Sequence, residues 1–177
     1  MPRLNVVDPA NATGPAKEAL DGPLKGMHIN IFKGMANSPA GLGVYLGISG
    51  ALKHGVLSEA EREAIMLAIS QITGCDYCLA AHTVLGKKAG LTDDQILSVR
   101  RNDATGDAKL DALTKFTVAV QEKKGYVSDE ELAAFRAAGY DDAAVVEVAA
   151  NIALITYTNL FNHINETEVD FPAAPAV

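Results

Sequence analysis

Two cysteines and a histidine in one short segment are the residues most able to do chemistry. The chain has 177 residues and only two cysteines, Cys75 and Cys78, and His82 follows four positions after the second. A Cys-x-x-Cys pair is a spacing typical of redox-active and of metal-binding sites. A histidine can exchange a proton with a thiol directly or through one water. These three side chains are therefore the first candidates for a functional site.

The surrounding sequence predicts that the pair lies at the start of a helix. Gly74 breaks the preceding helical run, and the next run begins at about Cys75 or Asp76. Spacings of three and four residues then put Cys75, Cys78 and His82 on one helix face. The positive end of a helix favours a thiolate and commonly lowers a cysteine pKa from about 8.5 to between about 3.5 and 7.5. Asp76 adds a negative charge that opposes this effect.

Glu63 is the best candidate for a carboxylate that orients His82. It lies on the preceding expected helix, just across the turn at Gly74. A carboxylate behind an imidazole fixes its orientation and its tautomer. Glu63 borders the apolar run 64–69, so we expect its side chain to be drawn partly into the interior.

Other interpretations of the cysteine pair stay open. A disulfide between Cys75 and Cys78 would close a very small loop and add little stability, so a cycling bond fits better than a structural one. Two buried, inert cysteines are one alternative. A zinc site is another, although Cys75, Cys78 and His82 supply only three ligands and no second Cys/His pair supplies a fourth. The remaining histidines are isolated and are expected to have ordinary roles: His28, His54 and His163.

The sequence predicts an all-α fold of about eight helices. No segment alternates apolar and polar residues well enough to be a strand. The expected helices cover residues 15–21, 39–54, 58–73, 76–89, 92–101, 107–124, 128–138 and 142–164. Capping boxes mark three of the starts, namely Ser58 with Glu61, Thr92 with Gln95, and Ser128 with Glu131. Glycines mark three of the ends, namely Gly90, Gly125 and Gly139. Residues 24–38 are expected to be irregular, with one short helical turn at most.

The last expected helix is almost apolar all round between residues 143 and 155. A helix of that kind is buried centrally or against another subunit. The stretch is too short to span a membrane and carries Glu147 and Asn151. The tail, residues 171–177, should be extended and mobile at its end.

Length and composition indicate a single domain over residues 1–177, with 1–29 and 171–177 peripheral. Hydrophobic residues make up 49% of the chain, which is enough for a core and excludes a disordered chain. The net charge of -7 and the lack of a basic cluster disfavour nucleic-acid binding. The first residues contain no apolar run like a signal peptide, so we expect a cytoplasmic protein that does not bind membranes.

The run of Glu63, eleven residues, Cys75-x-x-Cys78, three residues and His82 resembles the signature of the alkylhydroperoxidase D family. That family belongs to the larger carboxymuconolactone decarboxylase-like superfamily. The likeness extends over most of the chain from about Asn30 onward. The further segments that carry it are 64–68, 80–82, 88–92, 146–154, 159–163 and 170–172.

The resemblance implies an all-helical homo-oligomer of dimers or trimers, often a hexamer. It also implies reduction of alkyl hydroperoxides or hydrogen peroxide, an antioxidant activity that needs no haem, metal or flavin. Cys78 would be the cysteine attacked by peroxide and Cys75 the resolving one, with His82 and Glu63 as the proton relay. The resulting disulfide would be reset by an external dithiol, from a lipoylated or a thioredoxin-like reductant.

Tyr77 departs from the family pattern, because the best-known members carry a second histidine just before the second cysteine. A phenol is a poor base at neutral pH, so Tyr77 is at most an accessory residue. Three other functions remain possible: a general thiol–disulfide oxidoreductase, a lactone decarboxylase-like enzyme, and a non-enzymatic oligomeric scaffold. A thioredoxin would need a βαβ setting, which this sequence does not predict.

Overall fold

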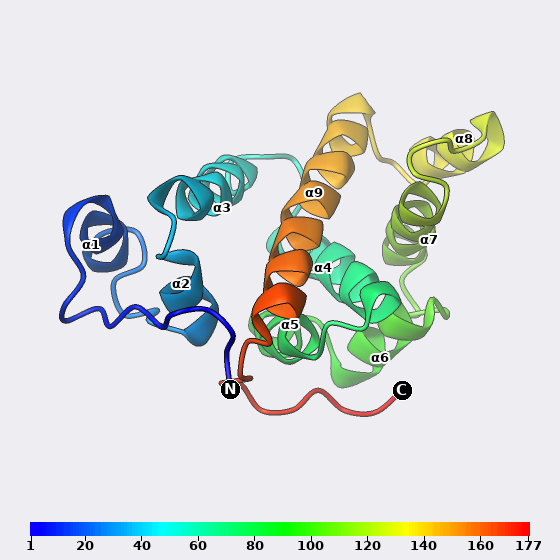
Figure 1. Ribbon diagram of the computed structural model, residues 1–177. Helices are drawn as coiled ribbons and strands as arrows, with labels where there is room; N and C mark the ends of the chain where they lie inside the picture. Colours follow the sequence, from blue (N-terminus) through cyan, green and yellow to red (C-terminus); the bar gives the residue numbers. More distant parts are fainter.

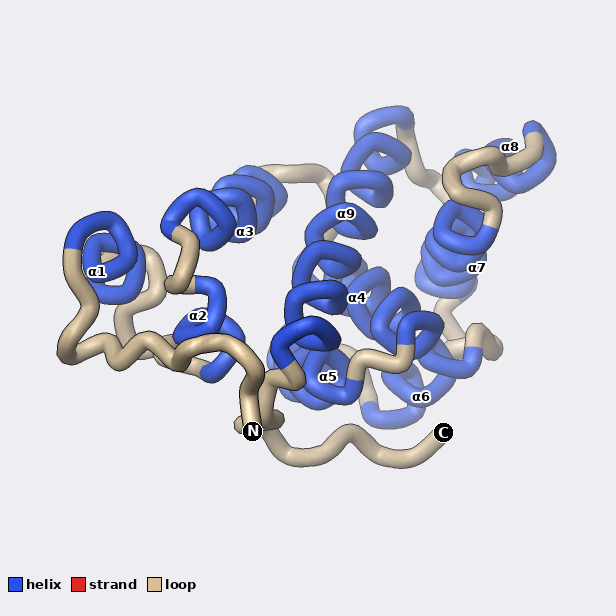
Figure 2. Tube along the Cα trace, in the orientation of Figure 1, coloured by secondary structure: helices blue, strands red, loops and turns tan.

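The computed structural model describes all 177 residues and contains helices and loops but no strands (Figures 1 and 2). The predicted all-α fold is therefore confirmed. The nine helices are α1 (Gly14–Asp21), α2 (Asn30–Met35), α3 (Pro39–Leu52), α4 (Glu59–Thr73), α5 (Asp76–Lys88), α6 (Asp93–Arg101), α7 (Ala108–Glu122), α8 (Asp129–Ala137) and α9 (Asp142–Asn165).

Eight of these helices match the predicted ones closely, and α2 is the exception. The sequence predicts at most one helical turn between residues 24 and 38, whereas the six residues of α2 form more than one turn. It has no side-chain cap, and Gly34 lies within it. Packing stabilises it instead, because Ile31, Phe32 and Met35 are all buried. A helix this short has too few residues to show a periodic pattern.

The boundary signals read from the sequence are present in the structure. All three predicted capping boxes form, at the starts of α4, α6 and α8. The three predicted end glycines all have positive φ: Gly90 at 103°, Gly125 at 87° and Gly139 at 95°. Glycine adopts this left-handed backbone without the clash that a Cβ would cause, which lets each helix stop cleanly.

Helix α4 is the centre of the fold, since α5, α6, α7 and α9 all pack against it (Figure 1). Its residues from Ala64 to Ser70 are buried without exception. The continuous apolar run in this segment is therefore explained by contacts on every side. Glu63, immediately before this run, is carried to the border of the interior as predicted.

Helix α9 lies in the centre of the fold, which is one of the two locations predicted for it. The distribution of polar and apolar residues over its faces is unexpected. Its buried face carries asparagines, including Asn151, Asn159 and Asn162. Its opposite face exposes Val146 and Leu160 to solvent. By length and composition alone α9 would pass for a membrane span. The buried asparagines, whose amide nitrogens all donate hydrogen bonds within the protein, instead mark it as the core helix of a helical bundle.

The turn between α4 and α5 sets the position of the cysteine pair. Gly74 caps α4 in the left-handed conformation, with φ 67° and ψ 35°. The N–H of Cys75 then donates to the carbonyl of Ser70 at 3.0 Å. This arrangement ends α4 and starts α5 within two residues, so Cys75 becomes the N-cap of α5.

The chain after α9 is extended, as predicted, and runs past α5 and α6 in Figure 1. The ring of Phe171 packs edge-on against Tyr77, with ring centres 5.7 Å apart. Arg100 donates through Nη1 to the carbonyl of Pro175 at 2.6 Å. Contacts therefore hold the tail almost to its last residue. At the other terminus, Leu20 and Leu24 are fully buried, so this segment contributes to the core.

Replacement of Gly74 by alanine should destabilise the fold through backbone strain alone, since a Cβ there would meet no other atom within 4 Å. We expect the free energy of unfolding to fall by about 1–2 kcal/mol. Gly74→Asn is the matched variant and should cost less, because asparagine tolerates the left-handed region. Urea denaturation measures both values, and equal stability of wild type and Gly74→Ala would contradict the assigned turn.

Candidate active site

The two thiols lie at the first turn of α5 and are both buried. Cys75 is 1% exposed and Cys78 is 2% exposed. Both cysteines are free. The sulfur of Cys75 accepts the backbone N–H of Cys78 at 3.4 Å, so a thiol takes the place that serine or aspartate usually fills at a helix start. The prediction that the pair opens a helix is confirmed.

The pKa values of the two thiols are shifted in opposite directions. The pKa of Cys75 is lowered, first by a hydrogen bond from the Cys78 thiol and then by the backbone N–H of Cys78. Burial opposes this shift, and the nearby imidazole of His82 assists it. The pKa of Cys78 is raised by its hydrogen bond to Cys75 and by burial. Cys75 is therefore the more acidic of the two thiols.

His82 and Glu63 form a close pair between α5 and α4. The imidazole Nδ1 lies 2.7 Å from Oε2 of Glu63, and the side chains are 18% and 14% exposed. An ionised carboxylate can only accept, so Nδ1 donates the hydrogen bond to Glu63 and Nε2 is left for other partners. The structure thus brings together the two residues that the sequence proposed as base and orienting group. No hydrogen bond joins the imidazole to either sulfur, so proton exchange needs one bridging water or a small motion.

The four predicted site residues do not make a metal centre. No three histidine, cysteine, aspartate or glutamate side chains lie close enough together to hold a metal ion. His82 is turned to Glu63, although it shares a helix face with the cysteines. A zinc site formed by Cys75, Cys78 and His82 therefore does not fit this geometry.

Tyr77 makes a structural hydrogen bond to the C-terminal tail. Its hydroxyl donates to Oδ1 of Asp170 at 2.7 Å and accepts the N–H of Ile31 at 3.3 Å. Burial and the hydrogen bond to Asp170 raise its pKa, so the phenol stays protonated at neutral pH. Tyr77 therefore joins α5 to the C-terminal segment.

Two asparagines of α9 complete the surroundings of the thiols, and the sequence analysis did not select them. Asn162 donates through Nδ2 to the sulfur of Cys78 at 3.3 Å. Asn159, one turn earlier, donates to the hydroxyl of Thr73 at 2.7 Å. Both asparagines are buried. A signal was available in the sequence, because a helix that is otherwise apolar carries asparagines three residues apart, on one face.

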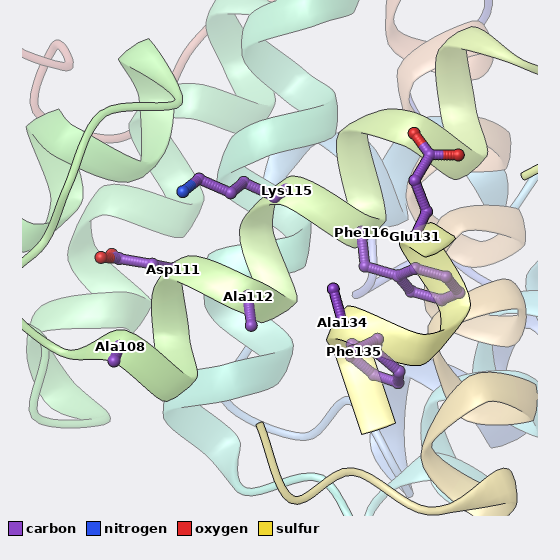
Figure 3. Close-up of a pocket in the computed structure, with 8 residues that line it drawn as sticks. All are labelled: Ala108, Asp111, Ala112, Lys115, Phe116, Glu131, Ala134 and Phe135. Carbon is purple, nitrogen blue, oxygen red and sulfur yellow. The ribbon is translucent and has the colours of Figure 1, made fainter. Parts of the chain in front are cut away.

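A separate hollow lies between α7 and α8 (Figure 3). It has a volume of about 420 Å³ and shares none of its lining residues with the thiol site. The rings of Phe116 and Phe135 stack at its wall with centres 4.2 Å apart. No thiol, histidine or unpartnered buried polar atom reaches it. The chemistry of the chain is therefore concentrated at the start of α5.

Two solved structures share this fold over nearly the whole chain. One is described as an alkylhydroperoxidase AhpD core, an uncharacterized peroxidase-related protein from Ralstonia eutropha JMP134. It has 22% identity and a TM-score of 0.85, and the match covers 96% of this chain and 92% of that one. The other is a peroxidase-related protein from Silicibacter sp. TM1040, with 19% identity, a TM-score of 0.80, and coverage of 94% and 89%. These likenesses define an AhpD-like helical fold.

Residues 44–113 match the Carboxymuconolactone decarboxylase family. This segment contains all four predicted site residues, Glu63, Cys75, Cys78 and His82. This part of the chain is thus similar to the carboxymuconolactone decarboxylase family, and the chain as a whole has an AhpD-like fold.

A further structure with this fold is the debrominase Bmp8. A variant with one cysteine replaced by alanine, in complex with 2,3,4-tribromopyrrole, has 16% identity and a TM-score of 0.72, with coverage of 96% of this chain and 94% of that one. No curated protein matches the chain significantly by sequence. The fold is thus shared by proteins described with different activities, and the function must be argued from the site itself.

The hydrogen bond between the thiols predicts an unusual titration. Alkylation by neutral iodoacetamide follows the thiolate, so its rate should rise with pH at a midpoint below the ordinary cysteine value of about 8.5. In Cys78→Ala the donating thiol is gone while burial remains, so the midpoint for Cys75 should move upward. In the matched variant Cys75→Ala, the pKa of Cys78 should fall from its wild-type value because the neighbouring thiolate is removed. An unchanged midpoint in Cys78→Ala would contradict the shared proton.

Proposed function

We propose that this protein is a thiol peroxidase that reduces alkyl hydroperoxides or hydrogen peroxide through a Cys75–Cys78 dithiol/disulfide cycle. The observation that carries the proposal is the pair of free cysteines at the start of α5, where the sulfur of Cys75 accepts the backbone N–H of Cys78 and its pKa is lowered. A thiolate is the form that attacks an O–O bond, and a second thiol beside it can resolve the product. The His82–Glu63 pair supplies a base on the same helix.

The proposed cycle accounts for each atom and electron. The Cys78 thiolate attacks the terminal oxygen of R–O–O–H, the O–O bond breaks, and the alkoxide leaves with the electron pair. Cys78 becomes a sulfenic acid, and the alkoxide takes a proton from the solvent or from His82 to become the alcohol. Cys75 then attacks the Cys78 sulfur, which releases water after protonation and leaves the disulfide. An external dithiol returns two electrons to the pair.

The assignment of Cys78 as the attacked residue must account for its raised pKa, because Cys75 is the more acidic thiol. A proton shift from Cys78 to Cys75 would leave the charge on Cys78. The amide of Asn162, which donates to Cys78, favours the charge after the shift. Cys75 is the alternative candidate for the cysteine that reacts first with the hydroperoxide.

The reductant must reach sulfurs that are almost completely buried. A slender dithiol, such as the lipoyl group of a lipoylated protein, needs a narrower opening than a thioredoxin-like domain. We therefore propose a lipoyl-type dithiol as the reductant of the cycle.

A second activity is suggested by the debrominase that shares the fold. Replacing an aromatic bromine by hydrogen consumes two electrons and releases bromide, and a dithiol supplies two electrons when it becomes a disulfide. Bromide release from a brominated pyrrole, measured beside hydroperoxide consumption, separates these activities. Disulfide exchange without consumption of either substrate would instead favour a general thiol–disulfide oxidoreductase.

Serine variants of the two cysteines test the proposed roles. Cys78→Ser should lose about a thousandfold or more in dithiol-dependent hydroperoxide turnover, because the attacking sulfur is gone. Cys75→Ser should also fail to turn over, yet consume one equivalent of hydroperoxide and accumulate a sulfenic acid at Cys78 that dimedone traps. Dimedone labelling of Cys75 in Cys78→Ser, with none at Cys78 in Cys75→Ser, would reverse the assignment. Undiminished turnover in Cys78→Ser would refute it.

We also propose that the chain assembles with copies of itself through the outer face of α9. Val146, Leu160 and Ile164 are 69%, 57% and 61% exposed. Their separations of 14 and 18 residues place them on one side of the helix. An apolar stripe of this kind on a central helix is typical of a surface that another subunit covers.

The assembly proposal predicts that Leu160→Glu lowers the molar mass seen by size-exclusion chromatography with light scattering. A charge placed in an apolar interface must be desolvated without a partner, which weakens association. Tyr126→Glu is the matched control, since Tyr126 is 87% exposed and lies away from α9 in the α7–α8 loop. A monomeric wild type, or an unchanged mass in Leu160→Glu, would contradict the assigned interface.

A further inference from the structure

Asn162 touches a reacting atom and has a second polar atom that the fold leaves without a partner. Its Nδ2 donates to the sulfur of Cys78 at 3.3 Å. Its Oδ1 is buried and accepts no hydrogen bond from the protein. The residue is 4% exposed. A buried carbonyl oxygen without a donor is costly, and each such atom in a native structure requires an explanation.

The neighbouring buried asparagines of α9 differ from Asn162 in what their amide groups contact. Asn165 donates to Thr167, and its Oδ1 accepts the N–H of Leu4, so both of its ends are used in the fold. Asn162 makes no such structural contact, because its one hydrogen bond goes to a thiol. Asn159 and Asn151 also have a buried Oδ1 without a partner, but their amide nitrogens donate to Thr73 and to the carbonyl of Glu147. Asn162 is therefore the buried asparagine of α9 that combines a partnerless oxygen with a hydrogen bond to a thiol.

We propose that Asn162 is a catalytic residue whose carboxamide clamps the hydroperoxide against Cys78, with Nδ2 donating to the sulfur and Oδ1 accepting the hydrogen bond of the substrate O–H. This inference rests on the proposed peroxidase function and deepens it by naming the group that recognises the substrate. The feature recognised is the terminal O–H that every hydroperoxide carries. Neither an ether nor a dialkyl peroxide offers it.

The chemistry of the attack explains why an acceptor belongs at this place. The sulfur approaches the terminal oxygen of R–O–O–H, which is the oxygen that bears the hydrogen. Because Nδ2 and Oδ1 belong to one planar amide, an acceptor that neighbours the sulfur also neighbours the oxygen the sulfur attacks. Such a hydrogen bond orients the O–O bond for the displacement, which is a contribution of positioning.

The same contact persists after the O–O bond breaks. The alkoxide leaves, and the hydroxyl stays on sulfur as Cys78–S–O–H, whose hydrogen again points to an acceptor. Asn162 would then hold the sulfenic acid in one orientation until Cys75 attacks the sulfur and water departs. The clamp also limits over-oxidation, since a second hydroperoxide cannot use an acceptor that the sulfenic acid already occupies.

Asn162→Leu tests the inference, because leucine has a similar size and lacks both polar atoms. Rates are measured at a pH where iodoacetamide alkylation has reached its plateau, so that the thiolate is fully formed in each protein. At that pH the alkylation rate of Asn162→Leu should stay within about twofold of wild type. The rate constant for cumene hydroperoxide should fall about tenfold to a hundredfold, as expected for loss of a hydrogen bond to a reacting group. Asn151→Leu is the matched control, because Asn151 is also buried on α9 with a partnerless Oδ1 but donates to the carbonyl of Glu147, eleven residues before Asn162; it should react normally.

Asn162→Asp keeps an accepting oxygen but replaces the donating Nδ2 by a negatively charged oxygen. It therefore tests the hydrogen bond to the substrate separately from the hydrogen bond to the sulfur. Its alkylation midpoint should move to higher pH, while its plateau rate with hydroperoxide should exceed that of Asn162→Leu. The inference would be overturned if the plateau rate constants of Asn162→Leu for hydroperoxide and for iodoacetamide fell by the same factor, or if neither fell. A wild-type protein that consumes no hydroperoxide would instead refute the proposed function, and the clamp with it.

Discussion

The hydrogen bond from the backbone N–H of Cys78 to the sulfur of Cys75 is the constraint on which the site depends. It exists because Gly74 ends α4 in the left-handed conformation and lets α5 begin at the next residue. The first N–H groups of a helix have no partner within the helix, so a thiolate at the N-cap satisfies one of them. Moving the turn by one residue would rotate both sulfurs away from this position.

Burial makes each donor around the sulfurs more important. Desolvation raises the pKa of both thiols, so a thiolate persists only if hydrogen bonds and nearby positive charge outweigh that cost. For Cys75 the thiol and the N–H of Cys78 are enough to lower the pKa. For Cys78 the amide of Asn162 works in the same direction but is outweighed in the resting state. The pair is thus a single proton-sharing unit, and its two titrations belong to both residues.

The positions of Glu63 and His82 follow from the packing of α4 on α5. Glu63 lies at the border of the buried run of α4, where its carboxylate is largely withdrawn from water but still next to the imidazole. This location limits the freedom of the His82 ring to choose another tautomer. Tyr77, between the cysteines, points away to Asp170 and links the same helix to the tail. The first turn of α5 therefore carries both the candidate site residues Cys75 and Cys78 and the residue that anchors the C-terminal tail, Tyr77.

Much of the fold was predictable because helix boundaries are encoded locally. Ser58, Thr92 and Ser128 each have their partner three residues later, so the starts of α4, α6 and α8 needed no knowledge of the tertiary structure. The four predicted site residues were also found locally, and the structure confirms that Cys75 opens a helix and that Glu63 meets His82. Their catalytic roles are a proposal.

What the sequence did not reveal depends on contacts between distant segments. Asn162 lies 84 residues after Cys78, and only the packing of α9 beside α5 brings its amide to the sulfur. Helix α2 has no cap from its own N-cap residue, and the N–H of Asn30 at its start instead donates to Asp170, 140 positions later. No local pattern reports such pairings.

The most direct test of the account is mass spectrometry of the fully reduced protein after one equivalent of an organic hydroperoxide. The account predicts the loss of two hydrogens from the intact mass and a peptide in which Cys75 and Cys78 are linked by a disulfide. Two free thiols and unconsumed hydroperoxide would contradict it.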